Sequence, residues 1–164
     1  MRFLVLGIPL LFLAACAPPI SRQSLELVDP GITFAELVRD PDRHVGRYLL
    51  LGGSIAANRS YGGGSELEIV QLPTDSRGRI TSTTRSDGRL IARDEAFRDP
   101  DIYRRGRLVT LVGQVTGSEA GRIDGMAYRF PVLVVQELRL WAPDEHPGIP
   151  RTRFGVGVGI GISR

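Results

Sequence analysis

The chain of 164 residues contains no lysine, one cysteine and two histidines. Because the single thiol has no partner, an internal disulfide is excluded. His44 and His146 lie far apart and each is flanked by loop residues, whereas a metal site needs several histidine, cysteine or carboxylate ligands at suitable spacing, so surface histidines are the simpler interpretation of both. All 21 basic residues are arginine, the net charge is only +3, and the arginines are interspersed with acidic residues. The sequence therefore predicts neither a metal site nor nucleic-acid binding.

Motifs of the common enzyme classes are also missing. No serine stands in the Gly-x-Ser-x-Gly turn of the serine hydrolases. The three glycines at 62–64 are not followed by the lysine and hydroxyl residue of a phosphate-binding loop. Glu66 and Glu68 share one face of a predicted strand, as paired carboxylates can, but a solvated strand face explains them more simply. We expect no catalytic activity and no cofactor.

The most informative feature that is present is the N-terminus. Arg2 is followed by an apolar stretch over 3–13 and then by Ala14, Ala15 and Cys16. A charged start, an apolar segment of roughly 7–15 residues and small residues before a cleavage site are typical of a secretory signal. The stretch is too short for a transmembrane helix, which needs about 20 apolar residues. The motif Leu-Ala-Ala-Cys at 13–16 resembles the lipobox of bacterial lipoprotein precursors, in which the cysteine carries diacylglycerol and becomes the first residue.

This resemblance divides the chain. Residues 1–15 are expected to be a lipoprotein signal peptide, and 16–29 a lipidated N-terminus with an extended, proline-containing tether. Residues 30–142 are expected to form the folded domain and 143–164 a Pro/Gly-rich tail. Two or three acyl chains on Cys16 hold a protein stably on a membrane without a transmembrane helix. In Gram-negative lipoproteins an aspartate after the cysteine commonly retains the protein at the inner membrane, so Ala17 points to the outer membrane.

The folded domain is predicted to be mainly β. Twenty glycines and eleven prolines favour short strands and turns. Thr33 and Glu36 form a capping-box pattern that predicts one short helix over 34–39. Five strands are predicted, over residues 47–57, 66–72, 89–93, 108–115 and 128–141. A polar turn region at 117–125 precedes the last strand, which is expected to be interrupted at Pro131. This pattern predicts a small, OB-like, five-stranded and partly open barrel with one short helix.

Five residues mark a candidate interaction surface. Tyr103, Arg104 and Arg105 lie in the densest cluster of charged and aromatic side chains, although a loop held by an Asp99 turn and local ion pairs is the simpler reading. Trp141 is either an interface anchor or the residue that closes the core at the end of the last strand. Val158 lies within a stretch at 154–162 where glycine alternates with apolar residues. Such a strand can add to the sheet of a partner, or form an extra edge strand or a loose tail.

Taken in order, the segments resemble the Slp family of Gram-negative outer-membrane lipoproteins, named for starvation-inducible lipoprotein. The resemblance rests on Cys16-Ala17, Phe34-x-x-Leu37, Pro41, Val45-Gly46, Gly52-Gly53-x-Ile55, Leu67-Glu68-Ile69, Ser86-x-Gly88-Arg89, Phe97-x-Asp99-Pro100, Tyr103-x-x-Gly106-Arg107, Val109-Thr110-x-Val112-Gly113-x-Val115, Tyr128-x-x-Pro131 and Leu140-Trp141.

The family implies an outer-membrane lipoprotein associated with starvation or stationary phase and with tolerance of acid or toxic metabolites. We expect its domain to face the periplasm. The family supplies no catalytic residues. We expect a non-enzymatic protein that supports the cell envelope under stress, with the membrane as one partner through the lipid anchor and an envelope protein as the other. The alternative is an OB-type binding module for an oligosaccharide or small ligand.

Overall fold

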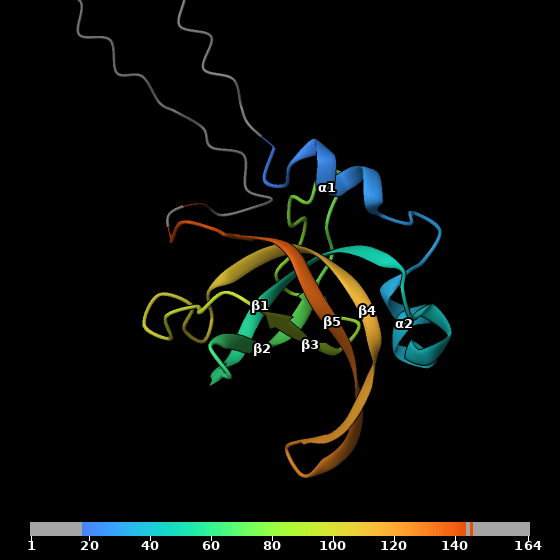
Figure 1. Ribbon diagram of the computed structural model, residues 1–164, viewed down its shortest axis with the longest axis vertical. Coiled ribbons are helices and arrows are strands. Elements are labelled where there is room, and N and C mark those ends of the chain that lie inside the picture. Colours follow the sequence, from blue (N-terminus) through green and yellow to red (C-terminus); the bar gives the residue numbers. More distant parts are fainter. Residues whose placement is uncertain (1–17, 144, 146–164) are drawn as a thin grey trace, which may run out of the picture.

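The computed structural model of the protein describes residues 18–143 and 145. Two short helices and a 3-10 turn come first in the chain, and the five strands that follow wrap into a barrel (Figure 1). In chain order the elements are α1 (Arg22–Leu27), α2 (Phe34–Arg39), the 3-10 turn η1 (Pro41–His44), β1 (Tyr48–Tyr61), β2 (Gly64–Leu72), β3 (Arg89–Asp94), β4 (Leu108–Ile123) and β5 (Met126–Leu140).

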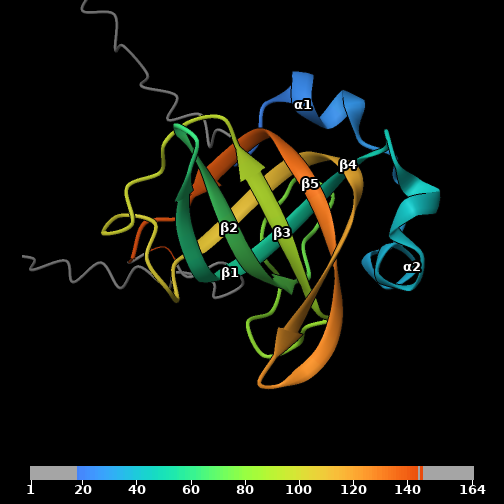
Figure 2. The same ribbon diagram turned by 60° about the horizontal axis from the view of Figure 1, so that its bottom comes forward.

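The strands close in the order β1-β2-β3-β5-β4, and β4 returns to β1. β1 makes closure possible because it pairs with β4 over 48–54 and with β2 over 52–61. At the bend a Cβ on Gly53 would collide with the Ile69 side chain and the Val70 carbonyl, so only glycine lets β1 and β2 approach this closely. β3 and β5 then complete the wall with a short parallel ladder, in which Ile91 lies opposite Val132 (Figure 2).

The predicted OB-like five-stranded barrel is confirmed, with two differences. The barrel is closed rather than partly open, because the β3–β5 ladder spans the gap. Two short α-helices are present instead of one. The predicted helix over 34–39 is α2, and both halves of its capping box form: the Glu36 N–H donates to Thr33 Oγ1 at 3.3 Å, and the Thr33 N–H donates to Glu36 Oε2 at 2.8 Å.

The main core fills the barrel interior, and α2 contributes Phe34 and Leu37 to it. Strand residues supply the remainder, with alternate side chains of β2 pointing inward, as the sequence pattern of 66–72 predicts. The other buried members of this cluster are Leu49, Leu51, Ile55, Leu67, Ile69, Leu90, Ala92, Val109, Leu111, Val115 and Leu133.

The β4–β5 hairpin is longer than predicted. The expected polar turn region at 117–125 is wrong over most of its length, because β4 continues to Ile123 and turns only at Asp124 and Gly125, which have φ values of 47° and 85°. The hairpin reaches beyond the barrel at the bottom of Figure 1. Pro131 does not interrupt β5; it lies where β5 pairs with β4 alone, and an edge strand tolerates a missing N–H on its free side.

The predicted extended tether is wrong over residues 18–29, which fold against the barrel. Ile20 is fully buried, and Ser21 caps α1 by accepting a hydrogen bond from the Ser24 N–H at 3.2 Å. The prolines at 18 and 19 precede the helix and so do not oppose it. After α1, Val28 forms a parallel bridge with Tyr48.

Over 18–143 and 145, no helix combines the length and apolar character needed to cross a membrane.

Replacing Leu67 by alanine tests the barrel core. Leu67 is fully buried among core residues, so the variant is expected to lose about 2–5 kcal/mol of unfolding free energy through lost apolar contact and the cavity left behind. Urea unfolding followed by circular dichroism measures this loss. The matched control is Leu27→Ala, because Leu27 is 46% exposed; equal losses for both leucines would contradict the assignment of the core.

Candidate functional site

A pocket of about 410 Å³ lies at the end of the barrel where β5 stops and the loop before β4 returns. Its volume is within the range of roughly 300–1,000 Å³ typical of small-ligand sites. Three of the five predicted interaction residues, Arg104, Arg105 and Trp141, line it together. The other lining residues are Gly106, Arg107, Leu108, Ala142, Pro143 and Glu145.

Trp141 holds the inner side of this pocket. Its side chain is buried with Leu72 and Ile80 in a second, small core cluster, and its indole N–H donates to Thr110 Oγ1 at 2.9 Å. The Thr110 hydroxyl in turn donates to the Gly78 carbonyl at 2.8 Å. Trp141 therefore closes the core at the end of β5, as the simpler sequence interpretation has it, and also borders the pocket.

Three arginines contribute to the remaining walls of the pocket, together with small and apolar residues and Glu145. Arg107 donates from Nη2 to the Trp141 carbonyl at 2.8 Å and from Nη1 to the Ile102 carbonyl at 3.1 Å. Arg139, next to the pocket on β5, lies over the Trp141 ring with its guanidinium carbon 4.9 Å from the centroid, and pairs with Glu145 at 3.2 Å. Arg104 and Arg105 are exposed, and their side chains make no hydrogen bond or ion pair with any residue in the described part of the chain.

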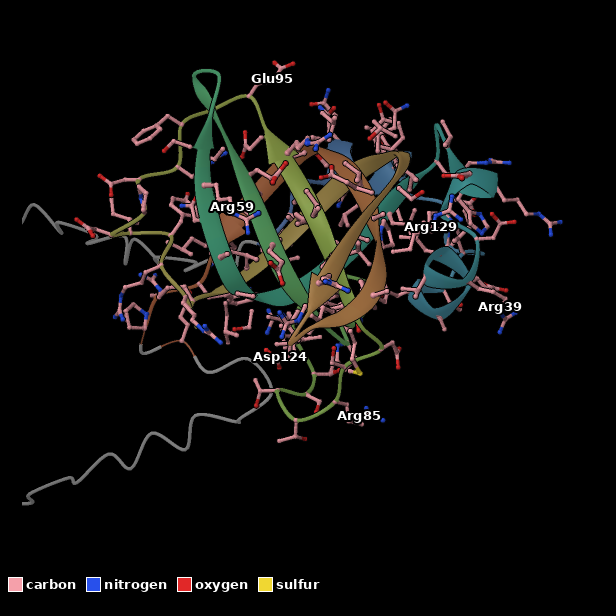
Figure 3. All side chains as sticks on the ribbon, turned by 90° about the horizontal axis from the view of Figure 1, so that it is seen from below. Arg39, Arg59, Arg85, Glu95, Asp124 and Arg129 are labelled. Carbon is pink, nitrogen blue, oxygen red and sulfur yellow. The ribbon has the colours of Figure 1, made fainter. Side chains whose placement is uncertain are left out.

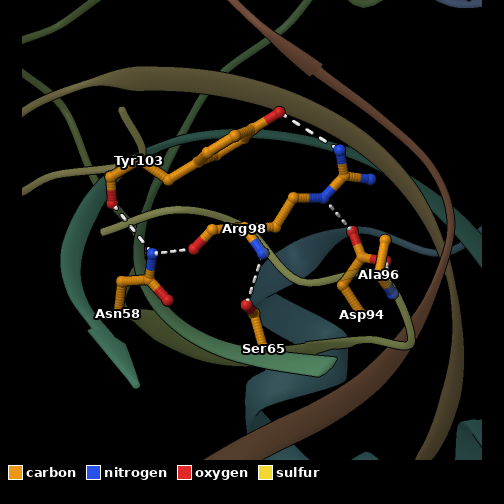
Figure 4. A network of polar contacts seen from close by, with 6 residues as sticks. All are labelled: Asn58, Ser65, Asp94, Ala96, Arg98 and Tyr103. Carbon is orange, nitrogen blue, oxygen red and sulfur yellow. Dashed lines mark hydrogen bonds and ion pairs between the residues drawn. The ribbon is translucent and has the colours of Figure 1, made fainter. Parts of the chain in front are cut away.

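Tyr103 lies next to these arginines in sequence but is not among the lining residues. Figure 4 shows that it belongs to a polar network that holds the loop: Arg98 Nη1 donates to its hydroxyl at 3.1 Å, and the Asn58 side chain donates to its carbonyl at 3.3 Å. Arg98 is fixed in turn by Asp94 at 2.7 Å. Burial opposes the charge on Arg98, but the hydrogen bond and charge of Asp94 outweigh burial and raise its pKa.

The Asp99 turn predicted from the sequence is also present. The Asp101 N–H donates to the Asp99 carboxylate at 2.8 Å, and the Tyr103 N–H donates to the Asp99 carbonyl at 2.8 Å. The loop is thus rigidly held up to Tyr103 and presents the next two residues, Arg104 and Arg105, at the pocket. Cys16, His146 and Val158 lie outside the described residues.

The outer face of β2 and β3 carries paired charges. Glu66 accepts from Arg93 at 3.0 Å and lies 3.6 Å from Arg59, and Glu68 pairs with Arg89 at 2.6 Å. The predicted solvated strand face for Glu66 and Glu68 is therefore corrected: each carboxylate is mostly covered and bonded across the strands. Figure 3 labels Arg59 on β1 and Arg129 on the β4–β5 hairpin. The Arg129 side chain points toward η1 and pairs with Asp42.

The β4–β5 hairpin covers part of the same face. Phe130 and Val132 pack on Ile91 of β3 outside the barrel, and the Tyr128 hydroxyl accepts from the Arg89 N–H at 2.9 Å. In the described segments no three histidine, cysteine or acidic side chains gather in a way that could hold a metal ion.

Comparison with known families gives a decisive result for this chain. The model of the outer membrane lipoprotein Slp family matches residues 13–154, a range that includes Cys16 and the whole barrel. The chain belongs to the outer membrane lipoprotein Slp family.

Relatives in other bacteria agree with this membership. The chain is 35% identical over 112 residues to the uncharacterized lipoprotein YeaY of Escherichia coli K12. The matched segment covers 68% of this chain and 58% of YeaY. It is 28% identical over 138 residues to the outer membrane protein Slp of the same organism, covering 84% and 73%. An uncharacterized protein of Haemophilus influenzae is 30% identical over 92 residues, covering 56% and 50%. The matches thus span less than two thirds of YeaY and of the H. influenzae protein.

Solved structures resemble the barrel at low identity. The mitochondrial single-stranded DNA binding protein Rim1 of S. cerevisiae is 19% identical with a TM-score of 0.33, covering 57% of this chain and 92% of Rim1. The Stn1–Ten1 complex of S. pombe gives 14% identity and a TM-score of 0.30, covering 57% of each chain. At these values the likeness concerns the fold and carries no statement about a ligand.

The family and the names of its relatives confirm the predicted location: the chain is a lipid-anchored protein of the outer membrane. Attachment of the lipid at Cys16 stays a prediction.

The described N-terminal segment is fastened beside the pocket. The Ser21 N–H and hydroxyl donate to the two carboxylate oxygens of Glu137 on β5, at 3.0 and 2.6 Å. Burial raises the pKa of the Glu137 carboxyl, but hydrogen bonds from Ser21 and Ser24 outweigh burial and lower it below the ordinary value. The ionised form is therefore the one that holds the segment.

Glu137→Gln tests this fastening through its pH dependence. Because the folded pKa lies below the unfolded one, the carboxylate stabilises the fold above the ordinary glutamate range, and this stabilisation is lost as pH falls through the lowered pKa. The variant is expected to melt at a lower temperature than the wild type near neutral pH, and the difference is expected to vanish in strong acid. Thermal unfolding across pH measures both. Glu26→Gln, on the exposed side of α1, is the control; a gap that persists in acid would contradict the account.

Proposed function

We propose that this Slp-family lipoprotein acts without catalysis, and that it supports the envelope under starvation and acid stress by binding another envelope component at the arginine-lined pocket. One observation carries the proposal: Arg104 and Arg105 are presented at a pocket of ligand size by a loop that is fixed on both sides, while both guanidinium groups lack a partner among the described residues. Because the backbone that carries them is fixed, both arginines are kept at the pocket, and their unpaired guanidinium groups are available for a ligand.

The chemistry of the pocket favours binding over catalysis. Its one described carboxylate, Glu145, already pairs with Arg139 and accepts from the Ala142 N–H at 3.0 Å. Arginine does not act as a proton donor or acceptor in the ordinary pH range, because its guanidinium stays charged. The same property suits a protein associated with acid stress, since a site built from arginine keeps its positive charge as pH falls.

The alternative is ligand binding on the β2–β3 face, where OB barrels commonly take oligosaccharides. This face is occupied by the protein itself: Glu66 and Glu68 pair with arginines across the strands, and the β4–β5 hairpin packs on Ile91. Because its charged groups are already paired and the hairpin covers part of it, this face is less accessible to a ligand than the pocket at the barrel end.

A photo-crosslinking residue at Arg105 tests the proposal in live cells. The lipidated protein is expected to give a discrete adduct with an envelope component, identified by mass spectrometry. The same residue at Arg85, another exposed arginine without a described ion pair, is expected to give none. A third site at Val158 asks separately whether the glycine-alternating tail docks on a protein. No adduct at Arg105, or the same adducts at Arg105 and Arg85, would overturn the proposed binding site.

A further inference from the structure

We infer that the component bound at the pocket is the headgroup of anionic phospholipids in the membrane that anchors the chain, so that this end of the barrel lies against the bilayer. The inference rests on the proposed function, because it uses the same pocket. It adds the chemical class of the ligand and the orientation of the domain.

The first step is that the N-terminal segment and the pocket meet at one end of the barrel. A Cβ built on Gly78 would lie 2.9 Å from Thr110 Cγ2 and 3.4 Å from Ile20 Cγ1, so these two side chains converge on Gly78. Thr110 is also the residue that accepts the indole N–H of Trp141. Ile20 of the N-terminal segment and Trp141 of the pocket are therefore linked through the same two residues, Gly78 and Thr110.

A second contact gives the same placement. Ser21 is bonded to Glu137, which precedes Arg139 by two residues on β5, and residues two apart on a strand point to the same face. Arg139 in turn lies over Trp141.

The second step is the length of chain between this segment and the lipid. From Pro18, where the description begins, to the predicted attachment at Cys16 the chain has two residues, which span at most about 7 Å. The lipid-bearing residue is thus held near the end of the barrel that contains the pocket. A domain tethered this closely has its pocket within reach of the headgroup layer.

The third step is the distribution of unpaired positive charge. Several arginines on the strands are paired, as with Arg89, Arg93 and Arg129. Exposed arginines with no ion pair among the described residues include five on α1, on the 75–79 turn beside Ile20 and on the pocket loop: Arg22, Arg77, Arg79, Arg104 and Arg105. Four others, Arg39, Arg43, Arg85 and Arg122, lie on other parts of the surface.

Acidic groups at this end are mostly bonded to the protein itself. Asp75 accepts the backbone N–H groups of Arg77 and Arg79, Asp99 accepts the Asp101 N–H, and Glu137 and Glu145 are bonded as described. Glu26 of α1 and Asp101 of the pocket loop are exposed carboxylates for which the described residues supply no partner. At the pocket itself Arg104, Arg105 and Arg107, with Arg139 beside them, outnumber the one described lining carboxylate, Glu145, so the pocket is positive.

Phosphate is the anion that fits both the groups and the place. A guanidinium offers two parallel N–H donors that match two phosphate oxygens. Anionic phospholipids attract arginines near the surface, and each arginine contributes roughly a fivefold gain in binding. In Figure 1 the β4–β5 turn lies at the bottom and α1, with the N-terminal segment, at the top, so docking of the side that carries this segment points the turn away from the membrane.

Trp141 reports directly on this arrangement, because it is the single tryptophan of the chain and lines the pocket. The full lipidated protein is reconstituted into vesicles that carry a nitroxide on some headgroups, which quenches nearby tryptophan fluorescence. Vesicles of phosphatidylcholine alone are compared with vesicles that also contain phosphatidylglycerol. Quenching is expected to be stronger in the anionic vesicles and to weaken with added salt.

The double variant Arg104→Gln/Arg105→Gln is expected to lower the docked population roughly tenfold or more and to return quenching in anionic vesicles to the level seen with phosphatidylcholine. Arg85→Gln/Arg122→Gln, which removes two exposed arginines on the 81–88 loop and near the β4–β5 turn, is the matched control and is expected to behave as wild type. All four side chains are exposed, and circular dichroism checks that both variants fold.

Equal quenching in the two kinds of vesicle, or no effect of the Arg104/Arg105 variant, would overturn the lipid assignment. A further arm adds inorganic phosphate to the protein in neutral vesicles. If Trp141 fluorescence responds to free phosphate while phosphatidylglycerol has no effect, the pocket takes a free anion and the lipid assignment fails. A protein adduct from Arg105 in cells, together with equal quenching, would leave the proposed function standing and overturn this inference alone.

Discussion

Trp141, Thr110 and Gly78 form a short chain of hydrogen bonds on which the end of the barrel depends. The indole N–H donates to the threonine hydroxyl, and the hydroxyl donates to the glycine carbonyl. Through it the end of β5, the start of β4 and the 73–88 loop are fixed together, and Ile20 packs on the same glycine. Gly78 has a φ of 82° and no room for a side chain between Thr110 and Leu50, so another residue there would separate the three segments. A buried hydroxyl satisfied on both sides also fixes which way the indole faces.

Charge is organised by position around the same barrel. Carboxylates on the strands meet arginines of the neighbouring strands, as Glu68 meets Arg89, and this removes free charge from the wall. At the barrel end, the loop that carries Arg104 and Arg105 is held by backbone hydrogen bonds and, earlier in the loop, by the ion pair between Arg98 and Asp94. The absence of lysine adds to this contrast, because all 21 strongly basic side chains are planar, permanently charged guanidinium groups.

Local sequence patterns predicted what local chemistry determines. The Thr33–Glu36 capping box gave α2 its bounds, the alternation over 66–72 gave β2, and the arginine-rich loop gave two of the pocket residues. The prediction for the N-terminal segment was wrong because contacts distant in sequence override local signals. Ser21 caps a helix only because Ile20 is buried against Gly78 and Glu137 accepts from Ser21.

The prediction of the β4–β5 hairpin was wrong for a different reason, the local composition of its strands. The hairpin packs on the barrel mainly through β5, with Phe130 and Val132 on Ile91. Residues 117–123 of β4 are half-buried or exposed, and they show a polar composition rather than the alternation of a half-buried strand. The pocket itself was not predictable as a unit, since Arg105 and Trp141 are joined only by the closing of the barrel.

The parallel ladder between β3 and β5 has a consequence for motion. It comprises three residue pairs, from Ile91–Val132 to Arg93–Val134, whereas β4 and β5 pair along almost their whole lengths. A wall opens first where the fewest hydrogen bonds must break together. We therefore expect opening of this barrel to begin along the β3–β5 seam, under the hairpin, while β4, which carries Thr110, and β5, which leads to Trp141, stay paired. Such a domain would flex on one side and still hold the pocket at its end rigid.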